Sequence, residues 1–164
     1  MSDINKTLLI EQLDCFQIQR HDFLNNFQVI RGYLQLNMPD KAIKYMDEAI
    51  STLVSQQEIS AIHAGWIKAI LLGFLFGLRL KGIEAKVNIP YNFKEENLLF
   101  DGEMEEYTGE FHRYTNECVE SSEVTNPECY MGKIELRAEQ NGFTCVYHLA
   151  KEDKIVFEKI FSTD

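Results

Sequence analysis

One histidine near the start of the chain stands among polar residues that suit chemistry at an imidazole nitrogen. His21 is followed directly by Asp22, and Asn25 lies four residues further on, so on a helix the histidine and the amide share a face. A neutral imidazole has one nucleophilic nitrogen and one N–H. A carboxylate that accepts from the N–H fixes the tautomer and raises the basicity of the other nitrogen. The group therefore favours phosphoryl transfer to and from His21.

A heptad pattern predicts the helix that positions His21. Apolar residues spaced alternately by four and three form a seam over residues 9–34, broken only by Arg20: Leu9, Leu13, Phe16, Phe23, Phe27, Ile30 and Leu34. His21 follows the seam position by one residue, so its side chain is expected to turn toward solvent. Gln17 and Gln28 extend this polar face. Arg20 either fixes the register of the seam or brings its guanidinium beside His21 to meet phosphoryl oxygens.

The chain after this helix predicts a second helix and a partner. Asn37 suits a helix stop, and Pro39 suits the first turn of a new helix over about residues 39–57. The connection is very short, so the two helices should pack as an antiparallel hairpin. Two helices make a poor core, and a second copy would complete a four-helix bundle across a two-fold axis. We therefore expect a homodimer, with residues 1–57 as the dimerisation and phosphoacceptor domain.

Residues 58–164 have a different pattern, which predicts a small α/β domain. A third helix is expected over residues 61–81, with His63 at its beginning and Gly82 as its stop. Alternating residues and a turn at Asn141-Gly142 predict a mainly antiparallel sheet. The expected strands and remaining helix cover residues 83–89, about 97–120, 133–139, 143–149 and 154–161. The fold class is therefore α+β.

The segment from Gln19 to Leu36, QRHDFLNNFQVIRGYLQL, resembles the phosphoacceptor helix of the sporulation initiation phosphotransferase B family. It is also similar to the corresponding helix of citrate- and dicarboxylate-type sensor histidine kinases. The resemblance implies that His21 is phosphorylated, that Asp22 assists it, and that Asn25 takes part in phosphoryl chemistry on the same face. It also implies a phosphorelay of two-component signalling, of the kind that controls sporulation.

Nucleotide-site motifs are missing from the second half. Asn116 is the only candidate for the asparagine-bearing helix of a kinase ATP site, no glycine occurs in residues 150–154, and no GxxxxGK loop is present. We therefore expect a domain that resembles a degenerate histidine-kinase ATPase domain and does not use ATP. No cofactor is expected to be bound by this chain. Mg²⁺ would come from a response-regulator partner, together with the aspartate that donates or accepts the phosphoryl group.

Composition narrows the range of partners and compartments. Of the 164 residues, 26 are acidic and 16 basic, which gives a net charge of -10 and disfavours nucleic acid and anionic membrane as partners. The most apolar run, residues 69–78, is too short to span a bilayer, so a cytoplasmic protein is expected. The cysteines are expected to be free thiols, several of them buried. Four residues could be combined into a zinc site, namely Cys118, Cys129, Cys145 and His148. Their spacing matches no common zinc-binding module.

The leading hypothesis is a phosphotransferase that moves a phosphoryl group between response-regulator aspartates through a phosphohistidine at His21. Receiver domains would dock on the surface around it, on Gln17, Arg20, Leu24 and Gln28. Two alternatives stay open: a non-enzymatic module that binds response regulators, and a phosphatase acting on aspartyl phosphate. His112, with Asn116 four residues later, imitates the His21 spacing. It lacks a following carboxylate and a heptad scaffold, so it is predicted to be a surface residue.

Overall fold

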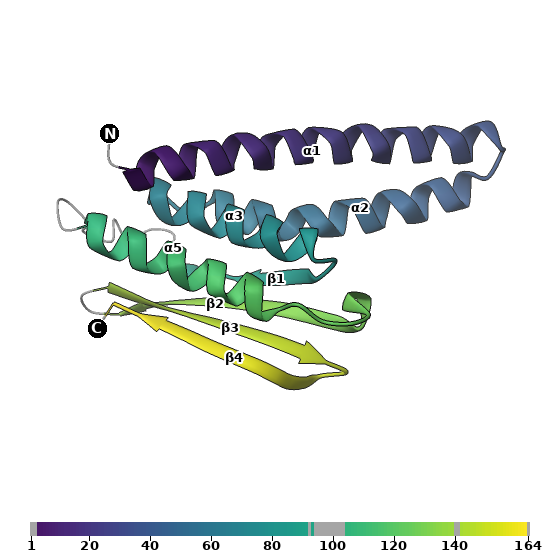
Figure 1. Cartoon of the computed structure of the whole chain (residues 1–164). Helices are drawn as coiled ribbons and strands as arrows, with labels where there is room; N and C mark the ends of the chain where they lie inside the picture. Colours follow the sequence, from purple (N-terminus) through teal and green to yellow (C-terminus); the bar gives the residue numbers. More distant parts are fainter. Residues whose placement is uncertain (1–2, 92, 94–103, 140–141, 164) are drawn as a thin grey trace.

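The first two helices form a long antiparallel hairpin (Figure 1). The computed structural model describes residues 3–91, 93, 104–139 and 142–163. Helix α1 (Asp3–Gln35) and helix α2 (Pro39–Ser60) are joined at Asn37, whose φ of 54° is a left-handed conformation that asparagine tolerates. Pro39 begins α2, where its missing N–H costs little. The predicted hairpin is confirmed, and α2 continues to Ser60 because the buried Ile59 extends its apolar stripe.

Helix α3 (Gly65–Leu80) is the most apolar of the long helices that the structure describes, and it ends in a defined cap. The N–H of Gly82 donates to the carbonyl of Arg79, and the N–H of Ile83 donates to the carbonyl of Leu78 at 3.0 Å. This is the Schellman arrangement, and it requires the positive φ of 77° that Gly82 adopts. Because α2 runs to Ser60, residues 61–64 form a connection. The predicted helix start at residue 61 was therefore wrong, and His63 lies outside α3.

Four strands form one mixed sheet in the order β1-β2-β3-β4. Strand β1 (Glu84–Asn88) runs parallel to β2 (Tyr130–Glu139), while β3 (Gly142–Lys151) and β4 (Lys154–Ser162) continue the sheet in antiparallel fashion. The predicted hairpin between β2 and β3 is present in the register, with Glu139 opposite Gly142. The turn residue Asn141 and residues 97–103 of the predicted fourth helix lie outside the described residues.

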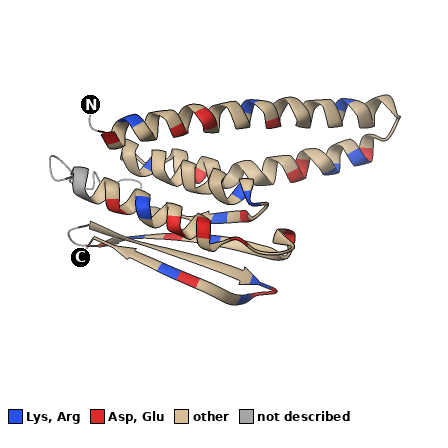
Figure 2. Ribbon diagram, in the orientation of Figure 1, with Lys and Arg blue, Asp and Glu red and all other residues tan. Residues whose placement is uncertain are grey.

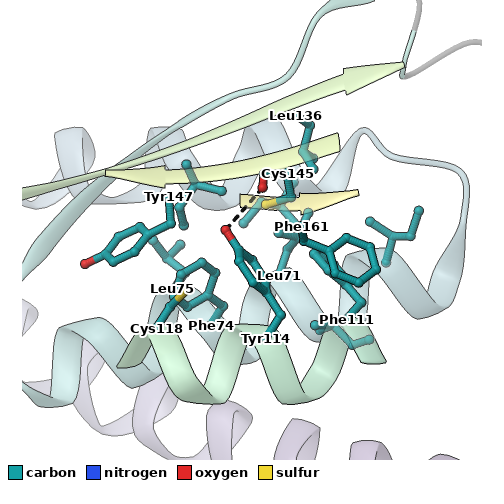
Figure 3. Packing of buried hydrophobic residues seen from close by; sticks show 14 of the residues in the cluster. Leu71, Phe74, Leu75, Phe111, Tyr114, Cys118, Leu136, Cys145, Tyr147 and Phe161 are labelled. Atoms are coloured by element: carbon teal, nitrogen blue, oxygen red, sulfur yellow. Dashed lines mark hydrogen bonds between the residues drawn. The ribbon is translucent and has the colours of Figure 1, made fainter. Parts of the chain in front are cut away.

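Helix α5 (Met104–Ser121) and α3 cover the inner face of the sheet, where the main core lies (Figure 1). Figure 3 shows Tyr114 reaching from α5 toward the sheet, where its hydroxyl donates to the carbonyl oxygens of Cys145 and Lys159 at 3.2 and 2.9 Å. Phe111 packs edge-on against Phe143. A short 3₁₀ helix, η1 (Pro127–Cys129), precedes β2. The chain is thus α+β, as predicted: helices first, then a small four-stranded sheet with its own helices.

Two further points concern the chain as a whole. In the part of the chain that the structure describes, no helix combines the length and apolar character needed to cross a membrane. The division into domains at residues 57 and 58 stays a prediction.

Candidate functional site

The middle of α1 presents one exposed face that contains His21. Helical spacing places five residues on this face, and all of them are exposed: Gln17, His21, Leu24, Asn25 and Gln28. The His21 side chain keeps 73% of its surface accessible. The predicted orientation of this residue, away from the seam and toward solvent, is therefore what the structure has. A macromolecular partner can reach the ring without any rearrangement of the helix.

Both polar neighbours of the His21 ring approach the same nitrogen. Nδ2 of Asn25 lies 3.2 Å from Nδ1, which is a hydrogen-bonding distance. Oδ1 of Asp22 lies 3.7 Å from Nδ1, which is an ion-pair distance but longer than a hydrogen bond. Among the described residues, none hydrogen-bonds to Nε2. Nε2 is therefore the nitrogen that is open to an incoming group.

The two neighbours favour different tautomers of the ring. When Nδ1 carries no proton, the amide of Asn25 donates to it and the proton resides on Nε2. When Nδ1 carries the proton, the carboxylate of Asp22 attracts it and Nε2 keeps its lone pair. Attack through Nε2 requires the second tautomer. Of the two contacts, the one with Asp22 is compatible with this tautomer.

Asp22 has a second partner that the sequence analysis missed. Oδ2 of its carboxylate lies 3.0 Å from Nη2 of Arg79, in the last turn of α3. The side chains of Asp22 and Arg79 are 28% and 39% accessible, so the pair is partly shielded from water. The only signal in the sequence was a basic residue near the end of an apolar helix. A residue of this kind commonly interacts with the negative end of the helix dipole. Nothing local indicated that this side chain would reach α1.

Three further side chains on the same side of α1 as Asp22 make polar contacts within the chain. Gln12 donates to the carbonyl of Ala69 on α3 at 2.9 Å, and Gln19 donates to Oε1 of Gln56 on α2 at 2.8 Å. Asn26 accepts from the hydroxyl of Tyr45 on α2 at 3.0 Å. Directional hydrogen bonds of this kind hold the register of α1 against α2 and α3.

The apolar seam of α1, by contrast, faces away from the rest of the chain. Six seam residues are exposed by between 39% and 67%: Leu9, Leu13, Phe16, Phe23, Phe27 and Leu34. Helix α2 adds exposed apolar side chains of its own, namely Ile43, Met46, Ile50 and Val54. Arg20, which interrupts the seam, is also exposed. Figure 2 shows charged residues of both signs scattered along α1, separated by longer uncharged stretches. Exposed apolar side chains gathered along two neighbouring helices mark an interaction surface.

The remaining histidines do not join the His21 site. His112 was predicted to be a surface residue, and this was wrong: its side chain is only 14% accessible, and Nε2 lies 2.9 Å from both carboxylate oxygens of Glu11. It thus connects α5 to α1. Asn116 approaches His112 Nε2 at 3.4 Å. His148 pairs with Glu158 on the neighbouring strand at 2.6 Å, and His63 is exposed in the connection before α3.

The cysteines are free thiols in different environments. Cys118 and Cys145 are buried, Cys15 is half-buried and Cys129 is exposed. Burial raises the pKa of the Cys118 thiol to about 12 and also raises the pKa of Cys145, so both stay protonated. Among the described residues, no group of three or more His, Cys, Asp or Glu side chains is placed to hold a metal ion.

Comparison with known families identifies the first part of the chain. The geometry defines an exposed histidine on a helical hairpin with an open apolar seam, followed by an α/β layer. Residues 4–62 match the family model of the SpoOB-type sensor kinase, alpha-helical domain. The match covers α2 and all of α1 except its first residue, and it confirms the resemblance drawn from the helix sequence. A search of curated proteins finds no match.

Proposed function

We propose that the protein is a histidine phosphotransferase that moves a phosphoryl group between the aspartates of two response regulators through His21. The observation that carries this proposal is the open Nε2 of His21, on a side chain that is 73% accessible, with Asp22 placed on the Nδ1 side of the ring. The SpoOB-type domain at residues 4–62 supports a role in two-component signalling.

The proposed reaction needs few groups from this chain. The lone pair on Nε2 of His21 attacks the phosphorus of an aspartyl phosphate, and the bond from phosphorus to the aspartyl oxygen breaks. The electron pair leaves with the aspartate carboxylate of the regulator, and the proton stays on Nδ1, where Asp22 stabilises the positive charge of the ring. The reverse step hands the group to a second aspartate. The receiver domain supplies Mg²⁺, and no nucleotide is consumed.

Docking of the receiver domain uses the exposed surface around the ring. Gln17 lies about one turn before His21 and Gln28 about two turns after it, and both offer amide contacts. Leu24 is 57% exposed on the same face and offers an apolar contact. Arg20 is exposed next to His21, where its guanidinium can meet the phosphoryl oxygens. Asn25 is exposed next to the ring of His21, where it contacts Nδ1.

A homodimer is part of the proposal. The apolar seam lies outside the packed core of the chain, while several polar side chains of α1 hydrogen-bond to α2 and α3. When the same face of a second copy covers the seam, the apolar side chains of both seams become buried in a four-helix bundle, and the dimer is a closed assembly. The protein is proposed to act in the cytoplasm, where response regulators occur, with neither nucleic acid nor membrane as its partner.

The test uses a phosphorylated receiver domain with Mg²⁺ and without nucleotide. The wild-type protein should acquire acid-labile, base-stable label, and His21→Ala should acquire none. His63→Ala is the matched control, since His63 is also exposed but lies away from α1, and it should label like wild type. Free phosphate without labelled protein would instead indicate the phosphatase alternative. Binding of the receiver with neither product would indicate the non-enzymatic module.

A further inference from the structure

We propose that Arg79 is a positioning residue for phosphoryl transfer, acting through Asp22 on His21. This inference rests on the proposed function and extends it, because it places a part of the reactive group on α3, outside the hairpin that carries the histidine. In this arrangement a residue in the last turn of α3 influences which tautomer of the His21 ring is populated.

One oxygen of the Asp22 carboxylate is held by Arg79, and the other faces the ring of His21. Oδ2 is 3.0 Å from Nη2 of Arg79, within charge-assisted hydrogen-bonding distance, and Oδ1 is 3.7 Å from Nδ1 of His21. With Oδ2 fixed by the guanidinium, rotation of the carboxylate is restricted and Oδ1 stays directed toward the imidazole. Without Arg79, the carboxylate can turn toward solvent, because 28% of the Asp22 side chain is accessible.

The base from which Arg79 extends is itself rigid. The carbonyl of Arg79 accepts from the N–H of Gly82 in the helix cap, and the neighbouring Leu78 and Ile83 are fully or almost fully buried. About three turns before Arg79 on α3, the carbonyl of Ala69 accepts a hydrogen bond from the side chain of Gln12 on α1. The distance between the two helices is thus set independently of the ion pair, so the guanidinium meets Asp22 in a fixed place.

The shape of the guanidinium matters to the assignment. Arginine presents a planar set of donors that can fix the orientation of a carboxylate, whereas lysine offers a mobile point charge. A contact that only clamps α3 to α1 would affect folding stability and leave the chemical step unchanged. A contact that orients Asp22 affects the step itself, and its effect disappears when the carboxylate is removed.

The experiment measures single-turnover transfer from a phosphorylated receiver domain to full-length protein, over a range of receiver concentrations. Arg79→Gln should lower the maximal rate by about 3- to 10-fold, between the effect of a half-exposed ion pair and that of a charge-assisted hydrogen bond. The receiver concentration at half-maximal rate should not change. Arg79→Lys should recover part of the rate. Arg137→Gln is the matched control, because Arg137 also pairs with a carboxylate, Glu135, but on the sheet, and it should behave like wild type.

A double-mutant cycle and a spectroscopic signature decide the assignment. In an Asp22→Asn background, Arg79→Gln should cause no further loss of rate. Ring ¹⁵N shifts of His21 should show less of the Nδ1–H tautomer in Arg79→Gln than in wild type. A wild-type rate in Arg79→Gln, an equal loss in both backgrounds, or a change only in the half-maximal concentration would overturn the inference. If wild type itself carries no label on His21, the proposed function fails first, so the two failures are distinguishable.

Discussion

Removing one aromatic ring from the exposed seam should weaken the dimer without weakening the folded chain. Phe27 is 67% exposed, the highest fraction among the seam residues of α1. Burying a phenylalanine side chain completely is worth about 1.5–3 kcal/mol, so covering two thirds of it contributes about 1–2 kcal/mol in each copy. Because a symmetric interface contains the residue twice, Phe27→Ala should cost about 2–4 kcal/mol of association free energy, or roughly a 30- to 1000-fold rise in the dimer dissociation constant.

Sedimentation equilibrium over a wide concentration range measures this constant directly. Leu80→Ala is the matched control, because Leu80 is 70% exposed but lies at the end of α3, outside the seam, and its dissociation constant should equal that of wild type. Circular dichroism of both variants should show native helix content. A Phe27→Ala variant that dimerises as tightly as wild type, or a wild type that stays monomeric at the highest concentrations, would refute this prediction.

Contacts that hold the helices and the sheet together have measurable consequences as well. His112→Ala should lower the free energy of unfolding in urea by about 1–2 kcal/mol, because the Glu11 carboxylate loses its imidazole partner; an unchanged midpoint would contradict this. Gly82→Ala should cost about 1–3 kcal/mol in thermal melts, since its φ of 77° strains any side chain. Burial raises the pKa of Cys118 from 9.0 to about 12, so the unfolded chain loses this proton first and stability should fall as pH rises above 9. Urea melts across that range should show the decline, whereas stability that is flat or rising would be inconsistent with it. A thiol reagent should modify the exposed Cys129 in the native protein and Cys118 only after unfolding. Rapid modification of both thiols in the native protein would contradict the burial of Cys118.

Periodic features of the chain could be predicted because they depend on neighbours in sequence. The heptad seam locates α1, and the position of His21 relative to that seam predicts its exposure, which is 73% for the side chain. Gly82 marks the end of α3 because the cap needs a left-handed residue at that point. Each of these inferences uses geometry that repeats within one helix or one turn.

Features that depend on contacts between distant elements could not be predicted in the same way. Arg79 on α3 pairs with Asp22 on α1, and the sequence pattern around either residue does not indicate that the two are in contact. His112 is shielded from solvent, contrary to the prediction, because its partner is Glu11, which is 101 residues away in the sequence. The start of α3 was placed too early, since the apolar pattern continues through the connection: Ile62 is buried there without being helical.

The most direct test of the central claim is a relay between two receiver domains. A receiver carrying labelled aspartyl phosphate is mixed with a second, unlabelled receiver and Mg²⁺, without nucleotide, in the presence of wild type or His21→Ala. We predict that the second receiver gains label with wild type, after transient labelling of the protein at His21, and gains none with His21→Ala. Equal labelling of the second receiver with both proteins would contradict it.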